Sequence, residues 1–370
     1  MTRTAYMDYN ATTPIYPSVV DVMCDALRHV GNPSSVHRMG REARAMMENA
    51  REAVASLINV PNDWVIFTSG GTEADALAIE GIGRKRVLVS SVEHAAVLNV
   101  SDDFEILPVD GNGILNLAAL EKALKSDETP TLISVMAANN ETGVVQPIKE
   151  IVELAHKYDA LMHCDAVQMI GKMNFDMRAL GCDLVSLSAH KLGGPKGVGA
   201  LVKREGLTLD ATHRGGGQER SLRGGTENLA GIIGFGAATK EKTDFIRIQA
   251  LRYDLEKQIK ELGGIIVAES VERLPNTTCV SLPGLASERQ VMALDLSGVM
   301  VSAGSACSSG TVKASHVLKA MGLDEEIAGC AIRVSLGWNS SKEDVDMFVQ
   351  AYSKLVERVQ VKKSSRYNAA

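Results

Sequence analysis

The sequence predicts an α/β fold with a mostly parallel sheet, followed by a smaller α+β domain. The chain has 370 residues and is 45% hydrophobic, which is enough for a large core and for more than one domain. Between residues 64 and 203, seven short apolar runs recur, and helical stretches separate several of them. After about residue 228 the pattern changes to short strands mixed with helices. We therefore expect ligands at the carboxyl ends of the strands in the first part.

The elements follow from these runs. The seven predicted strands are WVIFT (64–68), RVLVSS (86–91), FEILPV (104–109), TLISVM (131–136), ALMHC (160–164), LVSLS (184–188) and GALVK (199–203). Helices are predicted over 73–83, 117–125 and 148–158. In the second part, we expect a long helix from Asn228 towards Leu262. Further strands are expected at GIIVAE, TTCVSL, GVMVSAG and AIRVSL, and a frayed end at VKKSSRYNAA.

Composition argues against several classes of protein. The net charge is −6 and the basic residues are scattered, which argues against nucleic acid as a partner. No apolar run approaches the roughly 18 residues of a membrane helix, and we expect no targeting segment at the N-terminus. The six cysteines form no CxxC pair and no zinc-finger spacing with histidine. We therefore expect a reducing, cytoplasmic location.

The stretch LVSLSAHKLGGPKG (184–197) predicts a functional lysine. An apolar strand ends in Ser-Ala-His-Lys, and glycines and a proline then force a turn. Lys191 at such a strand end could be partly desolvated, which lowers the pKa of an amine and allows it to form a Schiff base. The alternative is an ordinary solvated loop lysine.

The stretch HCDAVQ (163–168) places a carboxylate at the same edge of the sheet. Asp165 directly follows a strand, where it could keep a pyridine nitrogen protonated. A metal site is a second interpretation, because His163 and Asp165 share one face of the strand, although no third ligand is apparent. The third is an aspartate that caps the following segment.

Two other strand ends carry weaker signals. FTSGGTEADALA (67–78) combines two glycines with a helix start, which suits a phosphate, although a plain strand–helix turn has the same pattern. It is neither a Walker A loop nor GxGxxG. His94 in VEHAAVLN could stack on a planar cofactor and move protons, or could be structural.

Two glycine-rich stretches stand outside the strands. GGGQERSLRGGTEN (215–228) could approach a phosphate or a partner, or could be a flexible connection between domains. SAGSACSSG (302–310) surrounds Cys307 with small residues. We expect this second stretch to be a mobile arm that carries a reactive thiol, with poor order over about 305–312.

Taken together, these stretches resemble the pyridoxal phosphate (PLP)-dependent cysteine desulfurases of iron–sulfur cluster assembly, in the class V aminotransferase family. The matching stretches run from residue 6 to residue 337 and are YMDYNATTP, GNPSSVH, TSGGTEA, VEHAAVL, NNETGVVQPI, DAVQ, SAHKLGGPKGVGAL, GGGQERSLRGGT, GSACSSG and IRVSLG. The resemblance implies PLP fold type I, with a large PLP-binding domain over 13–244. It also implies a small domain made of 1–12 and 245–370, which carries the catalytic loop (about 303–315).

The resemblance implies a role for each matching residue. Catalysis would fall to Lys191 as the Schiff-base lysine, Cys307 as the persulfide carrier and His94 as the ring-stacking proton shuttle. Asp165 would partner the pyridine nitrogen, and Gln168 and Asn140 would contact the ring's phenolic oxygen. The phosphate site would consist of Gly71, Thr72, Ser188 and His190, with Thr226 donated by the neighbouring subunit of a homodimer. Asn32 and Arg333 would bind the substrate carboxylate.

The implied activity is conversion of L-cysteine to L-alanine, with the sulfur held on Cys307 and passed to an acceptor. The acceptor would be an iron–sulfur scaffold, or a protein of tRNA thiolation. A class V aminotransferase or a selenocysteine lyase on the same fold is the alternative, and the thiol at Cys307 argues against the aminotransferase. The chain departs from many relatives at Trp338, where they carry arginine.

Overall fold

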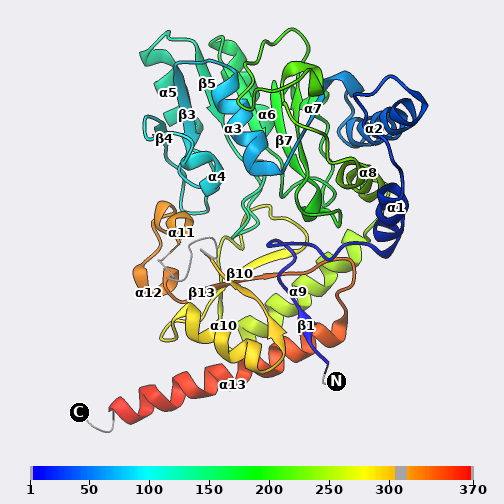
Figure 1. Cartoon of the computed structure of the whole chain (residues 1–370). Coiled ribbons are helices and arrows are strands. Elements are labelled where there is room, and N and C mark those ends of the chain that lie inside the picture. Colours follow the sequence, from blue (N-terminus) through cyan, green and yellow to red (C-terminus); the bar gives the residue numbers. More distant parts are fainter. Residues whose placement is uncertain (1–2, 305–314, 368–370) are drawn as a thin grey trace.

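The computed structural model describes residues 3–304 and 315–367, with side chains up to Val361, and shows a large sheet-centred part above a smaller part (Figure 1). The large sheet has the order β2-β8-β7-β6-β5-β3-β4. Its strands are β2 (Val65–Thr68), β3 (Arg86–Ser90), β4 (Glu105–Leu107), β5 (Thr131–Ser134), β6 (Leu161–Asp165), β7 (Leu184–Ser188) and β8 (Gly199–Lys203). Only β8 runs antiparallel to its neighbours, β2 and β7. The predicted α/β class and its seven-stranded, mostly parallel sheet are confirmed.

Both faces of this sheet are covered, which explains why its strands are nearly continuous apolar runs. In β7, Val185 and Leu187 belong to the core on one face, and Leu184 belongs to the core on the other. The first face packs against α2 (Arg38–Leu57), α5 (Leu117–Ser126), α6 (Ile148–Lys157) and α8 (Leu229–Ala238). The second packs against α3 (Gly71–Gly81) and α4 (Ala95–Leu98). The remaining elements are α1 (Pro17–Leu27), which packs on α8, η1 (Asn62–Trp64), α7 (Met177–Leu180), η2 (Ala189–Lys191) and η3 (Gln218–Ser221).

The smaller part contains a four-stranded sheet in the order β12-β13-β10-β9 and a parallel pair of β1 with β11. The strands are β1 (Ala5–Tyr6), β9 (Ile265–Ile266), β10 (Thr277–Ser281), β11 (Val299–Met300), β12 (Ser302–Ala303) and β13 (Ala331–Ser335). The helices are α9 (Phe245–Glu261), α10 (Ser287–Leu296), α11 (His316–Ala320), α12 (Glu325–Ala328) and α13 (Lys342–Tyr367). The packed pair α9 and α13 lies at the base of the molecule (Figure 1). The exact domain bounds at 12/13 and 244/245 stay a prediction.

The single long helix expected from Asn228 to Leu262 is wrong, because the structure has two helices there. α8 ends before Thr239, and α9 starts after Asp244, whose carboxylate accepts a hydrogen bond from the backbone N–H of Arg247 (3.0 Å). The intervening sequence TKEKTD is polar and cannot extend the buried face of α8, and its aspartate caps a new helix. No described helix has the length and apolar character needed to cross a membrane.

A buried ion pair fixes the glycine-rich loop 215–228 to the large sheet. Arg51 of α2 and Glu219 are 2.7 Å apart, and each side chain is only 2% exposed. Glu219 also accepts a hydrogen bond from the backbone N–H of Phe67 in β2 (2.9 Å). Glu219, Arg220 and Ser221 have φ angles of 45°, 55° and 63°, which side chains larger than glycine adopt at a cost. The pair therefore holds a strained turn against β2, the strand that precedes the turn at Gly70 and Gly71.

We predict that Glu219→Gln destabilises the protein by about 3–5 kcal/mol, because it removes the buried counter-charge of Arg51 and leaves only Glu48, whose side chain is 44% exposed. Urea unfolding of the variant and the wild type measures the difference. The matched control is Asp25→Asn, which breaks an ion pair with Arg28 whose side chains are more than 70% exposed and should change nothing measurable. Equal, small effects of the two substitutions would contradict the role given to this pair.

Candidate active site

A cavity of about 630 Å³ lies at the carboxyl ends of the large sheet and is closed below by residues of the smaller part. Ten residues predicted from the sequence line it: Gly71, Thr72, His94, Asn140, Asp165, Gln168, Ser188, His190, Lys191 and Arg333. Strands β6 and β7 end side by side, which brings Asp165 and the Lys191 turn to one edge, as expected for parallel strands. The cavity is therefore the place where the predicted residues could act together.

Lys191 ends η2, the short turn that follows β7. Its ammonium donates hydrogen bonds to the backbone carbonyls of Asn10 (2.6 Å) and Ala11 (3.0 Å). The backbone carbonyl of Lys191 accepts a hydrogen bond from the hydroxyl of Thr13 (2.8 Å). The N-terminal segment therefore binds both the backbone and the amine of Lys191. This argues against the alternative of a solvated loop lysine.

The floor of the cavity is rich in buried carboxyl groups. Asp165 accepts a hydrogen bond from the backbone N–H of Val167 (2.9 Å), and burial raises the pKa of its carboxyl against the opposing effects of that bond and of Lys191. Burial also raises the pKa values of Asp75, which lines the cavity, and of Glu93, which lies behind the lining residue Met136, well above their usual range. Among the described residues, one oxygen of each side chain has no hydrogen-bond partner, Asp75 Oδ1 and Glu93 Oε2. Such a floor suits a ligand that brings a protonated ring nitrogen.

His163, the other residue of the metal interpretation, lies in the sheet behind Asp165. Its Nδ1 and Nε2 lie 2.8 Å and 2.9 Å from the hydroxyls of Ser134 and Ser186. Burial lowers the pKa of His163 to about 3, so the ring is neutral. Within residues 3–304 and 315–367, no three histidine, cysteine, aspartate or glutamate side chains gather as a metal site would need. His163 therefore acts as a structural support for the strand that ends in Asp165.

An anion-binding turn forms one wall. α3 begins at Gly71, so its first backbone N–H groups and its dipole are available to an anion. A Cβ atom on Gly71 would lie 2.9 Å from a methyl group of Val167 and 3.6 Å from the Cβ of Ser188, so this close approach requires glycine. His190 lines the same cavity. Burial is the largest cause that lowers the pKa of His190 to about 4, and the charges of Lys191 and Lys196 act in the same direction. The turn fits the phosphate of a cofactor.

His94 caps α4 and faces the cavity. Its Nδ1 accepts a hydrogen bond from the backbone N–H of Ala96 (3.1 Å), which assigns the ring proton to Nε2. Burial is the largest cause that lowers the pKa of His94 to about 4, and the charges of Lys191, His316 and Arg333 act in the same direction. The imidazole is therefore neutral near pH 7, as stacking on a cationic ring would require.

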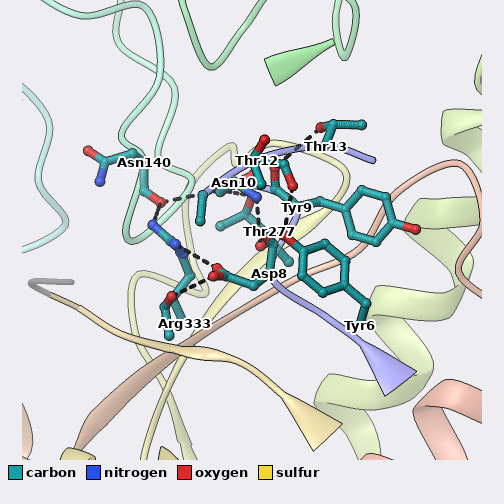
Figure 2. Close-up of polar contacts among 12 residues, drawn as sticks. Tyr6, Asp8, Tyr9, Asn10, Thr12, Thr13, Asn140, Thr277 and Arg333 are labelled. Atoms are coloured by element: carbon teal, nitrogen blue, oxygen red, sulfur yellow. Dashed lines mark hydrogen bonds and ion pairs between the residues drawn. The ribbon is translucent and has the colours of Figure 1, made fainter. Parts of the chain in front are cut away.

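Arg333 of β13 enters the cavity from the smaller part (Figure 2). One of its terminal nitrogens donates to Asp8 Oδ1 (2.7 Å) and the other donates to the backbone carbonyl of Asn140 (3.1 Å). Its Nε is buried and has no hydrogen-bond partner among residues 3–304 and 315–361. The guanidinium is thus oriented by two acceptors and retains a donor for a carboxylate.

Three predicted site residues do not line this cavity. Asn32 is exposed, and its side chain accepts a hydrogen bond from the backbone N–H of Ser34 (2.8 Å). Thr226 lines a separate cavity of about 160 Å³ together with Ser69, next to the anion-binding turn. Cys307, with the predicted mobile arm over 305–312, lies outside the described residues. Their roles stay predictions.

Sequence reasoning missed several residues that line or support the cavity, chiefly Asn10, Asp75 and Glu141. Asn10 lies in YMDYNATTP, which the resemblance quoted but to which no chemistry was assigned. Asp75 lies in FTSGGTEADALA, the stretch that contains the anion-binding turn. Glu141 follows Asn140 directly, and its carboxylate accepts a hydrogen bond from Ser315 (2.5 Å). Burial raises the pKa of Glu141 to about 7.

Comparisons with known proteins agree with this geometry. The family model described as aminotransferase class-V matches residues 5–348. Cysteine desulfurase IscS of Dictyoglomus turgidum is 41% identical, with 97% of this chain and 96% of the relative covered. A cysteine desulfurase of Cereibacter sphaeroides is also 41% identical, with 96% of each covered. The solved structure of a NifS-like protein from Rickettsia africae has a TM-score of 0.89 and 34% identity, with 96% of this chain and 100% of that chain covered.

We predict that Lys191→Met raises the pKa values of both His94 and His190 in the cofactor-free protein, because it removes a positive charge near both rings. The values should stay below 6.5, since burial, the largest cause, remains. Histidine ring shifts followed by NMR against pH measure both. The control Lys196→Met should raise only the pKa of His190, on which Lys196 acts. A wild-type His94 that titrates near 6.5 would contradict the account of this site.

Proposed function

The chain belongs to the aminotransferase class-V family and is a cysteine desulfurase, and on that basis we propose how its residues carry out the reaction. We propose that it binds pyridoxal phosphate at Lys191, takes sulfur from L-cysteine onto Cys307 and releases L-alanine. The observation that carries this proposal is that Lys191, Asp165 and Arg333 line one cavity. The amine can react with a cofactor aldehyde, and the buried carboxylate can pair with a ring nitrogen. The guanidinium can bind a substrate carboxylate.

The residues present fit pyridoxal phosphate. Asp165 would hold the proton on the pyridine nitrogen, and the turn at Gly71 and Thr72, with Ser188 and His190, would hold the phosphate. Gln168 and Asn140 would contact the ring oxygen, and His94 would cover the ring face. When bound, this cofactor supplies an electron sink for the carbanion that forms at the substrate Cα.

The protein's own groups then have defined tasks. Arg333, oriented by Asp8 and by the carbonyl of Asn140, binds the substrate carboxylate. The ε-amine of Lys191 takes the proton from Cα, because the carbonyls of Asn10 and Ala11 hold it at the edge of the cavity. A neutral His94 can receive a proton from the substrate amine or thiol.

Sulfur transfer falls to Cys307. Its thiolate attacks the substrate sulfur, and an S–S bond forms as the Cβ–S bond breaks. The electron pair of the broken bond remains with the carbon skeleton, which takes up a proton and leaves as L-alanine. The persulfide on Cys307 then passes its outer sulfur to an acceptor thiol. We propose that this acceptor is an iron–sulfur scaffold, or a protein of tRNA thiolation.

We further propose a cytoplasmic homodimer in which Thr226 reaches the phosphate site of the neighbouring subunit. Within one chain Thr226 shares a cavity with Ser69, which supports a role near a phosphate turn, and the reach to the neighbouring subunit follows from the resemblance. All five cysteines among the described residues are free thiols, which is typical of a reducing compartment. The names of the relatives disfavour an aminotransferase or a selenocysteine lyase as the main activity.

We predict that Cys307→Ser keeps the visible absorbance of the Lys191-bound cofactor and still binds L-cysteine, but releases no sulfide with a thiol reductant present. The serine hydroxyl lacks the nucleophilicity of a thiolate, whereas the cofactor site is unchanged. Sulfide and alanine assays together with an absorbance spectrum measure these properties. Lys191→Ala is the contrast, because it should lose both the absorbance band and turnover. Sulfide release by Cys307→Ser at the wild-type rate would refute the role of that thiol.

A further inference from the structure

Asn10 is the residue at which the N-terminal segment, the large sheet and the smaller part meet. It lies between β1 and α1, lines the cavity and is 1% exposed. Figure 2 shows its side chain beside Thr277 and Asn140, next to the ion pair of Asp8 with Arg333. Each polar group of Asn10 makes at least one hydrogen bond to another described residue, so its backbone and its amide are both fixed.

The backbone of Asn10 holds the predicted cofactor residues. Its carbonyl accepts hydrogen bonds from the Lys191 ammonium (2.6 Å) and from Nε2 of Gln168 (3.0 Å). Its N–H donates to the hydroxyl of Ser335 in β13 (3.0 Å). The amine and the amide expected to touch the cofactor therefore share one acceptor, and that acceptor is attached to the smaller part.

The side chain of Asn10 fixes the orientation of Gln168 through a second lysine. Lys172 is 7% exposed, and its amine donates to Asn10 Oδ1 (2.8 Å) and to Gln168 Oε1 (2.7 Å). Together with the bond from Gln168 Nε2 to the Asn10 carbonyl, these contacts close a ring. Because the Lys172 amine donates to both oxygens, the ring fixes the orientation of the Gln168 amide, whose nitrogen faces the Asn10 carbonyl.

The other end of the same amide reaches the substrate side. Asn10 Nδ2 donates to the hydroxyl of Thr277 (2.8 Å) and to the carbonyl of Asn140 (3.2 Å). That carbonyl also accepts from Arg333 (3.1 Å). Asn10 and the guanidinium thus hold one carbonyl between them, and the side chain of Asn140 itself lines the cavity.

We propose that Asn10 is a positioning residue. It fixes the relative positions of the Lys191 amine, the Gln168 amide and the Asn140–Arg333 pair. This inference rests on the function proposed above. With the cofactor and L-cysteine bound, the carbonyl of Asn10 would keep the free Lys191 amine beside the substrate Cα. The closed ring would keep the Gln168 amide in one orientation for the ring oxygen of the cofactor.

The test compares Asn10→Asp with Gln290→Glu in the full-length protein. Asn10→Asp keeps the size of the side chain but removes two donors and sets an anion against the Asn140 carbonyl. Gln290 makes a matched control, because it is also buried and its amide donates to the carbonyls of Leu285 (2.7 Å) and Cys330 (2.6 Å). It is not among the described residues that line the large cavity. The control therefore makes the same change of amide to carboxylate away from the site.

For Asn10→Asp we expect the dissociation constant for pyridoxal phosphate and the KM for L-cysteine to rise about tenfold, the combined effect of two lost hydrogen bonds to neutral groups and of the new anion beside the Asn140 carbonyl. The pH midpoint of the visible absorbance of the Lys191-bound cofactor should rise by about half a unit, because a donor to the ring oxygen is weakened and an anion is added nearby. Gln290→Glu should lower Tm but leave the dissociation constant, KM and midpoint near wild-type values.

Three results decide the matter. Unchanged cofactor affinity and midpoint in Asn10→Asp, or equal shifts in both variants, would overturn the proposal and leave Asn10 as a structural cross-link. If Asn10→Asp does not fold, Asn10→Ala replaces it. We expect the same rise in KM and in the dissociation constant for Asn10→Ala. Wild-type values of both in that variant would overturn the proposal. The wild type is measured first, because a wild type without the absorbance band refutes the proposed function rather than the role of Asn10.

Discussion

The N-terminal segment that crosses from β1 to α1 is the constraint on which the site depends. Its residues bind the Lys191 amine through the carbonyls of Asn10 and Ala11, and the Lys191 backbone carbonyl through the hydroxyl of Thr13. The same segment pairs Asp8 with Arg333 (2.7 Å). The lysine belongs to the large sheet and the arginine belongs to the smaller part. Their separation is therefore set by the segment from Asp8 to Thr13, which forms a turn at residues 9–11 and binds both side chains.

Burial of charge defines what this site can accept. Two carboxyl groups, Asp75 and Asp165, line the cavity, and Glu93 lies behind the lining residue Met136; desolvation raises the pKa of each. Desolvation also lowers the pKa of Lys172 well below its usual range, and the positive charges of Lys191 and Arg333 act in the same direction. A cofactor with a cationic ring and an anionic tail matches the carboxyl floor at one end and the start of α3 at the other.

The sequence allowed the strand-end residues to be predicted, because their positions depend on local pattern. Apolar runs located β6 and β7, and parallel strands bring Asp165 and Lys191 to one edge. The role of Asn10 has no such pattern, since its partners Ser335 and Lys191 lie 325 and 181 residues away in the chain. The break between α8 and α9 was missed because the cap at Asp244 looked like one more polar position within a helix. Burial-driven pKa shifts, as at Glu141, depend on packing and are invisible in the sequence.

The central claim is that Lys191, and not the neighbouring Lys172, holds the cofactor. Reduction of the enzyme with borohydride in the presence of pyridoxal phosphate, followed by peptide mass mapping, tests it directly. The account predicts a single modified peptide that carries the pyridoxyl group on Lys191. Modification of Lys172, which lies outside the main cavity, or an unmodified Lys191 in a protein that has bound the cofactor, would contradict it.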